Sequence, residues 1–226
     1  MLQVWTAADE MEIFESAWNF DHFYPIFVED TSGPCMEAWI TLAALAQATR
    51  RIRVGCLVSG VVYRHPAVLA NMISSLDIVS NGRLEIGLGA GWNDEECEAY
   101  GIELGTMTQR FDRFDECCEI ITSLLTQETT NFEGSYFKLK NARNNPAGIQ
   151  KPHPPICIGG GGPKRTLPNV ARYAQHWNYP SSDLEGFLNR RKILYSICNE
   201  IGRDPAEIID LPPITIPMLK LEFVFN

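Results

Sequence analysis

The feature that most constrains the fold of this 226-residue chain is its alternation between two hydrophobic periods. Short, nearly continuous apolar runs, such as RIRVGCLVSG (51–60) and RLEIGLGAG (83–91), are typical of buried parallel strands. Between such runs lie stretches whose apolar residues are spaced as in amphipathic helices. Repeated strand–helix units predict a parallel sheet covered by helices, either an open doubly wound sheet or a closed barrel.

Turn and capping residues mark several element boundaries. Pro66 stands in the first turn of one predicted helix, and Asn81-Gly82 follows the end of that helix. Glu133-Gly134 marks the turn of a small hairpin. We therefore expect an opening helix, then strands at 13–20, 51–60, 83–91, 154–160, 176–180 and 208–217, helices at 36–49, 66–80, 109–126, 163–175 and 183–202, and a hairpin at 131–142.

Polar or glycine-rich residues follow several of the predicted strands. They are Asp21-His22, Ser59-Gly60, the GLGAG run at 87–91 and four glycines at 159–162. A barrel gathers the carboxyl ends of its strands around one mouth, where its active site lies, whereas a doubly wound sheet has one switch point. This distribution favours a (β/α)8 barrel over an open sheet.

The number of strands is small for a complete barrel. About six wall strands are predicted, where a full barrel has eight and about 250 residues. The chain is long enough for one sizeable core. We expect a single, partial barrel domain over 1–226, with 211–226 as a divergent tail.

Composition excludes several classes of function. The net charge is −9 and no basic stripe is present, which argues against nucleic acid as a partner. The N-terminus does not resemble a signal peptide, and no apolar run reaches the roughly 18 residues of a membrane helix. The seven cysteines lie mostly in apolar runs, and the four histidines lack metal-ligand spacing. We expect a cytoplasmic protein without membrane or metal partners.

Two glycine-rich runs are candidates for ligand binding. GLGAG is not the dinucleotide fingerprint, because Trp92 stands where the last glycine is needed. It is either a tight turn or a place where a flat ligand approaches the backbone. In IGGGGPKRT (158–166), four glycines precede a helix, which favours a phosphate site over a simple turn.

The pair Asp21-His22 is the candidate for catalysis. Such a pair is as often structural as catalytic, but its position at a predicted strand end favours catalysis. Of the other histidines, His65 precedes a helix and is expected to cap or pack, and His153 lies in a proline-rich segment and is expected to be structural. His176 is ambiguous.

Several segments taken together resemble the luciferase-like monooxygenase superfamily, in particular its branch of oxidoreductases that use the deazaflavin coenzyme F420. The resemblance covers roughly residues 5 to 205 in order. The segments are DHFYP, RIRVGCLVSGVVYRHPAVLA, LDIVSNGRLEIGLGAGWNDEECEAYGI, RFDRFDECCEII and PPICIGGGGPKRTL.

This resemblance implies a (β/α)8 TIM barrel that binds F420 or FMN at its mouth. It implies that His22 lies beside the reactive centre of the ring, that Asp21 orients His22 or supports its loop, and that Leu57-Val58 forms a bulge, often with a cis peptide. The sugar-phosphate dehydrogenase branch has a tryptophan where this chain has Ile26 and an acid where it has Trp92, so sugar phosphates are disfavoured as substrates. The implied cofactor contacts are Asp21, His22, Leu57, Val58, Gly89, Ala90, Gly91, Trp92, Asn93, Gly160, Gly161 and Gly162.

Three functional hypotheses follow. The first is hydride transfer between F420 and a small organic substrate, with His22 as general acid/base or as hydrogen-bond donor to the ring. The second is a monooxygenase that uses FMN and molecular oxygen. The third is a cofactor-binding or partner-dependent chain without catalysis. The sequence is also compatible with a homodimer.

Overall fold

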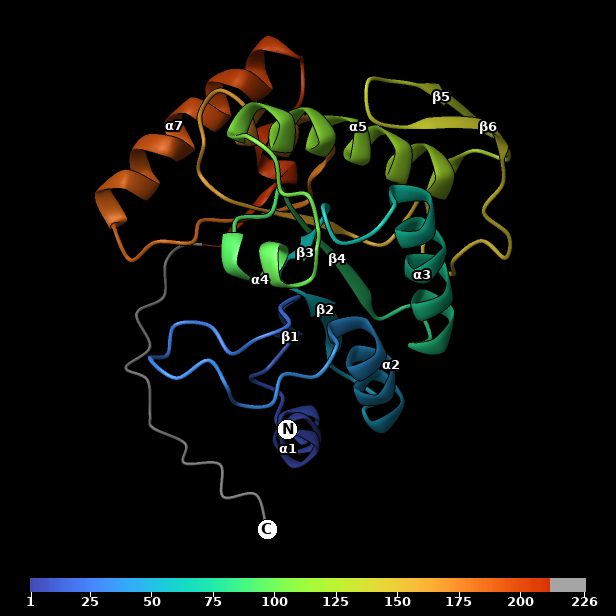
Figure 1. Cartoon of the computed structure of the whole chain (residues 1–226), viewed down its shortest axis with the longest axis vertical. Coiled ribbons are helices and arrows are strands. Elements are labelled where there is room, and N and C mark those ends of the chain that lie inside the picture. Colours follow the sequence, from blue (N-terminus) through green and yellow to red (C-terminus); the bar gives the residue numbers. More distant parts are fainter. Residues whose placement is uncertain (212–226) are drawn as a thin grey trace.

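The computed structural model describes residues 1–211 of the chain. Its centre is a curled parallel sheet in which successive wall strands lie side by side in chain order, β1-β2-β4-β7-β8-β9 (Figure 1). A seventh, very short strand, β3, pairs with β4. The strands are β1 Ser16–Asn19, β2 Arg53–Cys56, β3 Ser59–Gly60, β4 Leu84–Gly89, β7 Ile156–Gly159, β8 His176–Asn178 and β9 Ile209–Leu211.

Helices connect the strands and cover the outer face of the sheet (Figure 1). Their apolar faces supply the outer half of the core, and the fully buried side chains include Leu42, Ile73 and Phe114. An antiparallel hairpin, β5 Thr130–Glu133 and β6 Lys138–Ala142, packs outside α5. The helices are α1 Leu2–Glu10, α2 Ala38–Ala48, α3 Pro66–Val79, α4 Asp94–Ala99, α5 Met107–Thr126, α6 Thr166–Tyr173 and α7 Leu184–Glu200, with a 3₁₀ turn at Pro205–Glu207.

The architecture confirms the predicted partial barrel. Six parallel wall strands are present, each joined to the next by a crossover, and β1 and β9 are the edge strands of the described sheet. The predicted hairpin and the end of α3 are also confirmed, since Asn81 and Gly82 have φ values of 56° and 76° after this helix. Apart from its first residue, Leu211, the predicted tail at 211–226 lies outside the described residues, as does most of the predicted strand 208–217.

The observed strands are mostly shorter than predicted, and two of them differ for a clear structural reason. The first begins at Ser16 rather than residue 13, because the chain turns after α1 and the Phe14 N–H bonds to Met11 O. The predicted strand 51–60 is divided into β2 and β3, and the break falls at a cis peptide bond between Leu57 and Val58. Parallel pairing of β1 with β2 starts only where Ser16 meets Arg53.

One glycine of the GLGAG run has a structural role in the sheet itself. A Cβ atom on Gly87 would lie 1.8 Å from the carbonyl oxygen of Cys56. No side chain fits there, so Gly87 allows the neighbouring strand to approach. Gly87 lies within β4, so its role is neither the tight turn nor the ligand approach considered for this run.

Candidate functional site

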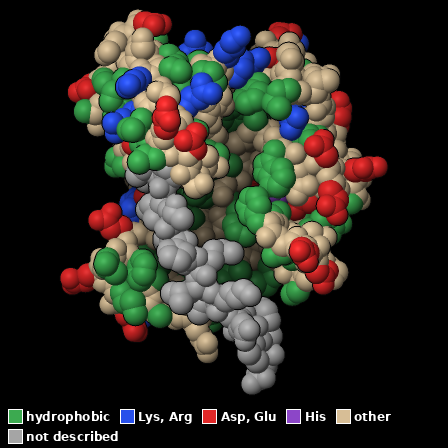
Figure 2. Space-filling view, turned by 90° about the vertical axis from the view of Figure 1, so that its left-hand side faces the viewer, with side chains coloured by type: hydrophobic (Ala, Val, Ile, Leu, Met, Phe, Trp, Pro, Cys, Tyr) green, Lys and Arg blue, Asp and Glu red, His purple; other side chains and the backbone are tan. Residues whose placement is uncertain are grey.

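The carboxyl ends of the wall strands surround a cavity of about 610 Å³. Figure 2 shows hydrophobic side chains gathered around a hollow on this face of the molecule. Eleven of the twelve residues predicted to contact a cofactor line this cavity, and Asn93 does not. The other lining residues are Phe20, Ile26, Phe27, Gly60, Tyr63, Met107, Arg110, Phe111, Phe114, Gly159, Thr166, Asn178 and Pro180.

His22 is the imidazole of the cavity. It follows β1, and only 8% of its surface is exposed. Its Nδ1 lies 2.7 Å from Oε2 of Glu96. Its ring meets the indole of Trp92 edge-on, with 5.4 Å between ring centroids. One ring nitrogen is thus held by a carboxylate, while the ring itself borders the cavity.

Glu96 is the group that the sequence analysis missed. It lies on the short helix α4 and is fully buried, although it stands in the acidic run NDEECEA. Burial alone would raise the pKa of Glu96, but the hydrogen bonds from His22 and from the Tyr24 and Phe23 N–H groups outweigh burial, and the pKa lies below its ordinary value. Glu96 is therefore an ionised carboxylate beneath His22.

The Asp21 carboxylate pairs with an arginine rather than with His22. This carboxylate does not contact His22 in this structure but accepts hydrogen bonds from Nη1 and Nη2 of Arg64, at 2.5 and 3.0 Å. Arg64 also pairs with Glu37 at the start of α2. Burial raises the pKa of Asp21, and Arg64 opposes that rise. Of the two roles expected for Asp21, this contact fits support of the loop, and the carboxylate that contacts His22 is that of Glu96.

The cis peptide between Leu57 and Val58 projects into the cavity wall, as the family resemblance implies. A Cβ atom on Gly89 would lie 2.4 Å from Cγ2 of Val58, and one on Gly159 would lie 3.0 Å from Cγ1. These two glycines leave room for the Val58 side chain between β4 and β7. Val58 in turn contributes apolar surface to the cavity.

The glycine-rich segment after β7 supplies polar backbone to the same cavity. Gly160 has a φ of 119°, which L-residues with side chains avoid, and its N–H donates to Asn178 O. Within residues 1–211, the N–H groups of Gly161 and Gly162 donate to no other protein group. They lie just before the N-terminus of α6, where a helix favours negative charge.

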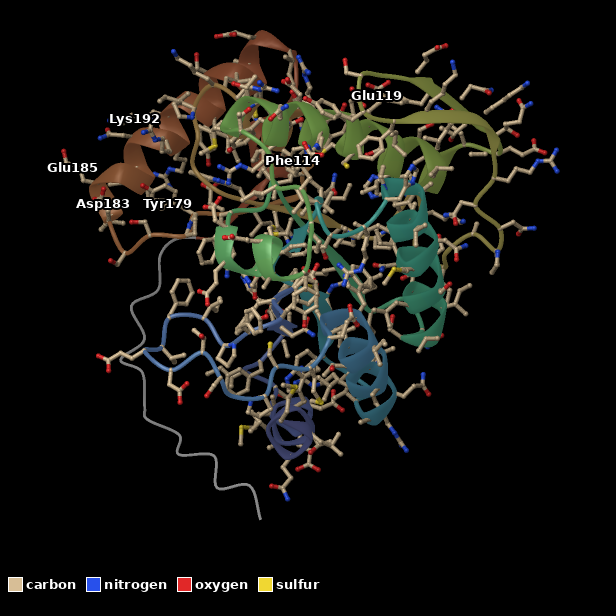
Figure 3. All side chains as sticks on the ribbon, in the orientation of Figure 1. Phe114, Glu119, Tyr179, Asp183, Glu185 and Lys192 are labelled. Atoms are coloured by element: carbon tan, nitrogen blue, oxygen red, sulfur yellow. The ribbon has the colours of Figure 1, made fainter. Side chains whose placement is uncertain are left out.

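Arg110 is a second residue that the sequence analysis did not identify. It is the fourth residue of α5 and lines the cavity, and its Nη1 lies 3.3 Å from Gly91 O. Its Nε is buried without a hydrogen-bond partner in the described part of the chain. Figure 3 labels Phe114, a cavity residue from the same helix. A cation and two free amide groups in a cavity of this size fit a planar cofactor that carries a phosphate.

The remaining predicted residues have local structural roles. Asn93 caps α4, and its Oδ1 accepts from the Glu96 N–H at 3.2 Å. His65 caps α3 as expected, and His153 Nδ1 contacts Pro154 O. His176, the ambiguous one, lies at the amino ends of the strands beside the buried Glu85.

The sequence predicts neither a metal site nor a membrane-spanning helix. Across residues 1–211, no cluster of histidine, cysteine or carboxylate side chains could hold a metal ion. No helix in this part of the chain is both long and apolar enough to cross a bilayer. All seven cysteines are free, and six of them are buried.

Comparison with known proteins places the chain in a family. The family described as luciferase-like monooxygenase matches residues 5–215. The chain belongs to the luciferase-like monooxygenase family. This membership agrees with the partial parallel barrel and with the cavity at its carboxyl end.

Two of the curated relatives are named as F420-dependent enzymes. The chain is 32% identical over 208 residues to the F420-dependent hydroxymycolic acid dehydrogenase of Mycobacterium tuberculosis, covering 89% of this chain and 54% of the relative. It is 34% identical over 163 residues to the F420-dependent glucose-6-phosphate dehydrogenase of Amycolatopsis mediterranei, covering 71% and 46%. A solved F420-dependent secondary alcohol dehydrogenase, in complex with an F420-acetone adduct, has the same fold, with a TM-score of 0.83, 23% identity and coverage of 92% and 62%. The chain spans about half the length of these curated relatives.

Proposed function

We propose that this chain is the cofactor-binding part of an oxidoreductase that transfers a hydride between F420 and an organic substrate. The observation that carries the proposal is a buried imidazole, His22, held by a carboxylate at the wall of a cavity whose other walls are glycine-rich strand ends. The F420-dependent relatives support the choice of cofactor. When bound, F420 accepts or gives a hydride at its ring carbon C5.

The residues of the chain would divide the work of binding. Gly89, Gly91 and Val58 line the cavity and would border the ring. Arg110 and the free N–H groups of Gly161 and Gly162 would hold its phosphate, because an anion satisfies both the guanidinium and the amides.

His22 would manage the proton of the substrate. When an alcohol is oxidised, its carbon gives up a hydride and its hydroxyl gives up a proton. An imidazole accepts such a proton near neutral pH, since its unperturbed pKa is about 6.5. Phe20 and Trp92 flank the imidazole of His22 in this cavity, so its surroundings are largely apolar.

The wall of the cavity favours an apolar substrate over a sugar phosphate. Apart from His22, the acidic and basic side chains among the described lining residues are Asp21, which is paired with Arg64, and Arg110. Near the mouth the wall is formed by Phe20, Ile26, Phe27, Trp92 and Met107. A homologous series of 2-alkanols tests this class. If each added CH₂ is buried, kcat/KM rises about fourfold per carbon, from about 0.8 kcal/mol per CH₂.

Titration of the purified chain with F420 and with FMN tests the cofactor. We expect saturable binding of F420 and turnover of a 2-alkanol that is abolished in His22→Ala. FMN binding with consumption of oxygen would favour the monooxygenase alternative, for which the family description is the support. Wild-type turnover by His22→Ala would contradict the role given to His22.

A further inference from the structure

Each hydrogen-bond partner of the Glu96 carboxylate is a group that can act as a donor. Its Oε1 accepts from the backbone N–H groups of Phe23 and Tyr24, at 2.7 and 2.9 Å. Its Oε2 lies 2.7 Å from His22 Nδ1 and 3.1 Å from the Tyr63 hydroxyl. The carboxylate has no exposed surface. A buried charge is stable only with such a set of partners.

These contacts determine which nitrogen of His22 carries the proton. The two backbone groups can only donate, so Oε1 is committed to them. The Tyr63 hydroxyl remains protonated, because burial and the neighbouring Glu96 raise the pKa of Tyr63. An ionised carboxylate can only accept, so Nδ1 of His22 must be the N–H that faces Oε2. In neutral His22 the other nitrogen, Nε2, then holds a lone pair, and within residues 1–211 it has no hydrogen-bond partner.

We propose that Glu96 is a positioning residue that holds His22 in its Nδ1–H tautomer, so that Nε2 can take the hydroxyl proton of the substrate. This role rests on the proposed function. The substrate O–H bond breaks and an Nε2–H bond forms, while the hydride from the adjacent carbon passes to the bound F420. The imidazolium that results is stabilised by the Glu96 carboxylate until Nε2 returns its proton to solvent.

Replacement of Glu96 by glutamine reverses this arrangement with almost no change in shape. The amide oxygen must stay with the Phe23 and Tyr24 N–H groups, so the NH₂ group faces His22. That NH₂ group can only donate, and Nδ1 must become the acceptor. The neutral ring then carries its proton on Nε2, where it can no longer act as a base.

Nitrogen-15 NMR of the histidine side chains tests the tautomer without cofactor. The His22 signals are assigned as those absent from His22→Gln. We expect the Nδ1–H tautomer in the wild-type chain, the Nε2–H tautomer in Glu96→Gln, and the wild-type tautomer in Glu95→Gln, an exposed neighbour on α4 that loses the same charge. An Nε2–H tautomer in the wild type would overturn the proposal, and this measurement does not depend on folding of any Glu96 variant.

Kinetics of the F420-loaded chain supply the second readout. We expect Glu96→Gln to lower kcat by about 10²–10⁴-fold, the range of general-base catalysis, with little change in KM. The pH profile of kcat/KM is expected to change in this variant and to stay that of the wild type in Glu95→Gln. A fully active Glu96→Gln with an unchanged pH profile would overturn the proposal. Absence of turnover in the wild-type chain would instead refute the proposed function, while the NMR result would still report on Glu96.

Discussion

The ion pair beside His22 gives a stability prediction that can be worked out from the structure. Asp21 is 2% exposed, and Arg64 supplies two hydrogen bonds to its carboxylate. Arg64→Met keeps much of the side-chain volume but removes both donors. Breaking a buried pair by removing one partner costs about 3–5 kcal/mol. Since folded domains are stable by about 5–15 kcal/mol, we expect a large fall in the free energy of unfolding.

A double variant is the matched control. Asp21→Asn/Arg64→Met removes both charges together, so no unpaired carboxylate remains buried. Glu37 also loses Arg64, but its side chain is 33% exposed and water can replace the lost partner. We therefore expect the double variant to recover much of the stability that Arg64→Met loses.

The pH dependence separates this mechanism from a simple packing defect. Burial already raises the pKa of Asp21, and loss of Arg64 removes what opposes that rise. A carboxyl with a raised folded-state pKa binds more protons in the folded than in the unfolded chain. The stability of Arg64→Met therefore rises as the pH falls from neutral toward the unfolded pKa of about 3.9, and its deficit shrinks in acid.

Urea unfolding of the three proteins at about pH 7 and about pH 5 measures these differences, with equal m values as the check on comparability. A deficit below about 1 kcal/mol, the size typical of an exposed ion pair, would refute the reasoning. So would a deficit that does not decrease in acid.

Other positions around the sheet give three further expectations. Arg110→Met should weaken F420 binding about 10- to 150-fold, from about 1.5–3 kcal/mol for a hydrogen bond to a charged group. We expect only a small loss of unfolding free energy, because the buried Nε has no partner in the described residues and the Nη1 contact with Gly91 O is long, at 3.3 Å; equal affinity in a binding titration would contradict the binding role. Gly89→Ala should lower the free energy of unfolding in urea by about 1–3 kcal/mol, since its Cβ would lie 2.4 Å from Cγ2 of Val58; an unchanged free energy of unfolding would refute the close contact. Burial raises the pKa of Glu85, but bonding to His176 and Arg53 outweighs burial and lowers it, so its stabilising effect is present above the unfolded pKa of about 4.3 and lost as the pH falls through the folded pKa; acid unfolding of Glu85→Gln, followed by circular dichroism, should lack that part of the transition.

The sequence predicted the wall of the barrel well because its strands are nearly continuous apolar runs. Runs such as LEIGLG in β4 and ICIG in β7 are buried over most of their length, and their short length and bordering glycines indicate strands rather than helices. Element ends were less predictable. Where β1 begins depends on its register with β2 and on the turn after α1, and neither leaves a local pattern.

The candidate site was predicted where glycines or paired polar residues follow a strand, and missed where it depends on tertiary contact. Glu96 lies 74 residues from His22 in the chain and stands in an acidic run that reads as exposed surface. One signal could have found it. Asn93 followed three residues later by Glu96 is a helix-start pattern, which would have indicated α4 and singled out this glutamate. Arg110 has no comparable signal, since its burial results from the packing of α5 over the cavity.

Transfer of a deuterium label tests the central claim most directly. A 2-alkanol deuterated at its carbinol carbon is incubated with the chain and oxidised F420, and the reduced cofactor is analysed by mass spectrometry. Direct hydride transfer predicts reduced F420 that carries the deuterium, formed together with the unlabelled ketone. Reduced cofactor without deuterium, or an oxygenated product formed with consumption of oxygen, would contradict the account.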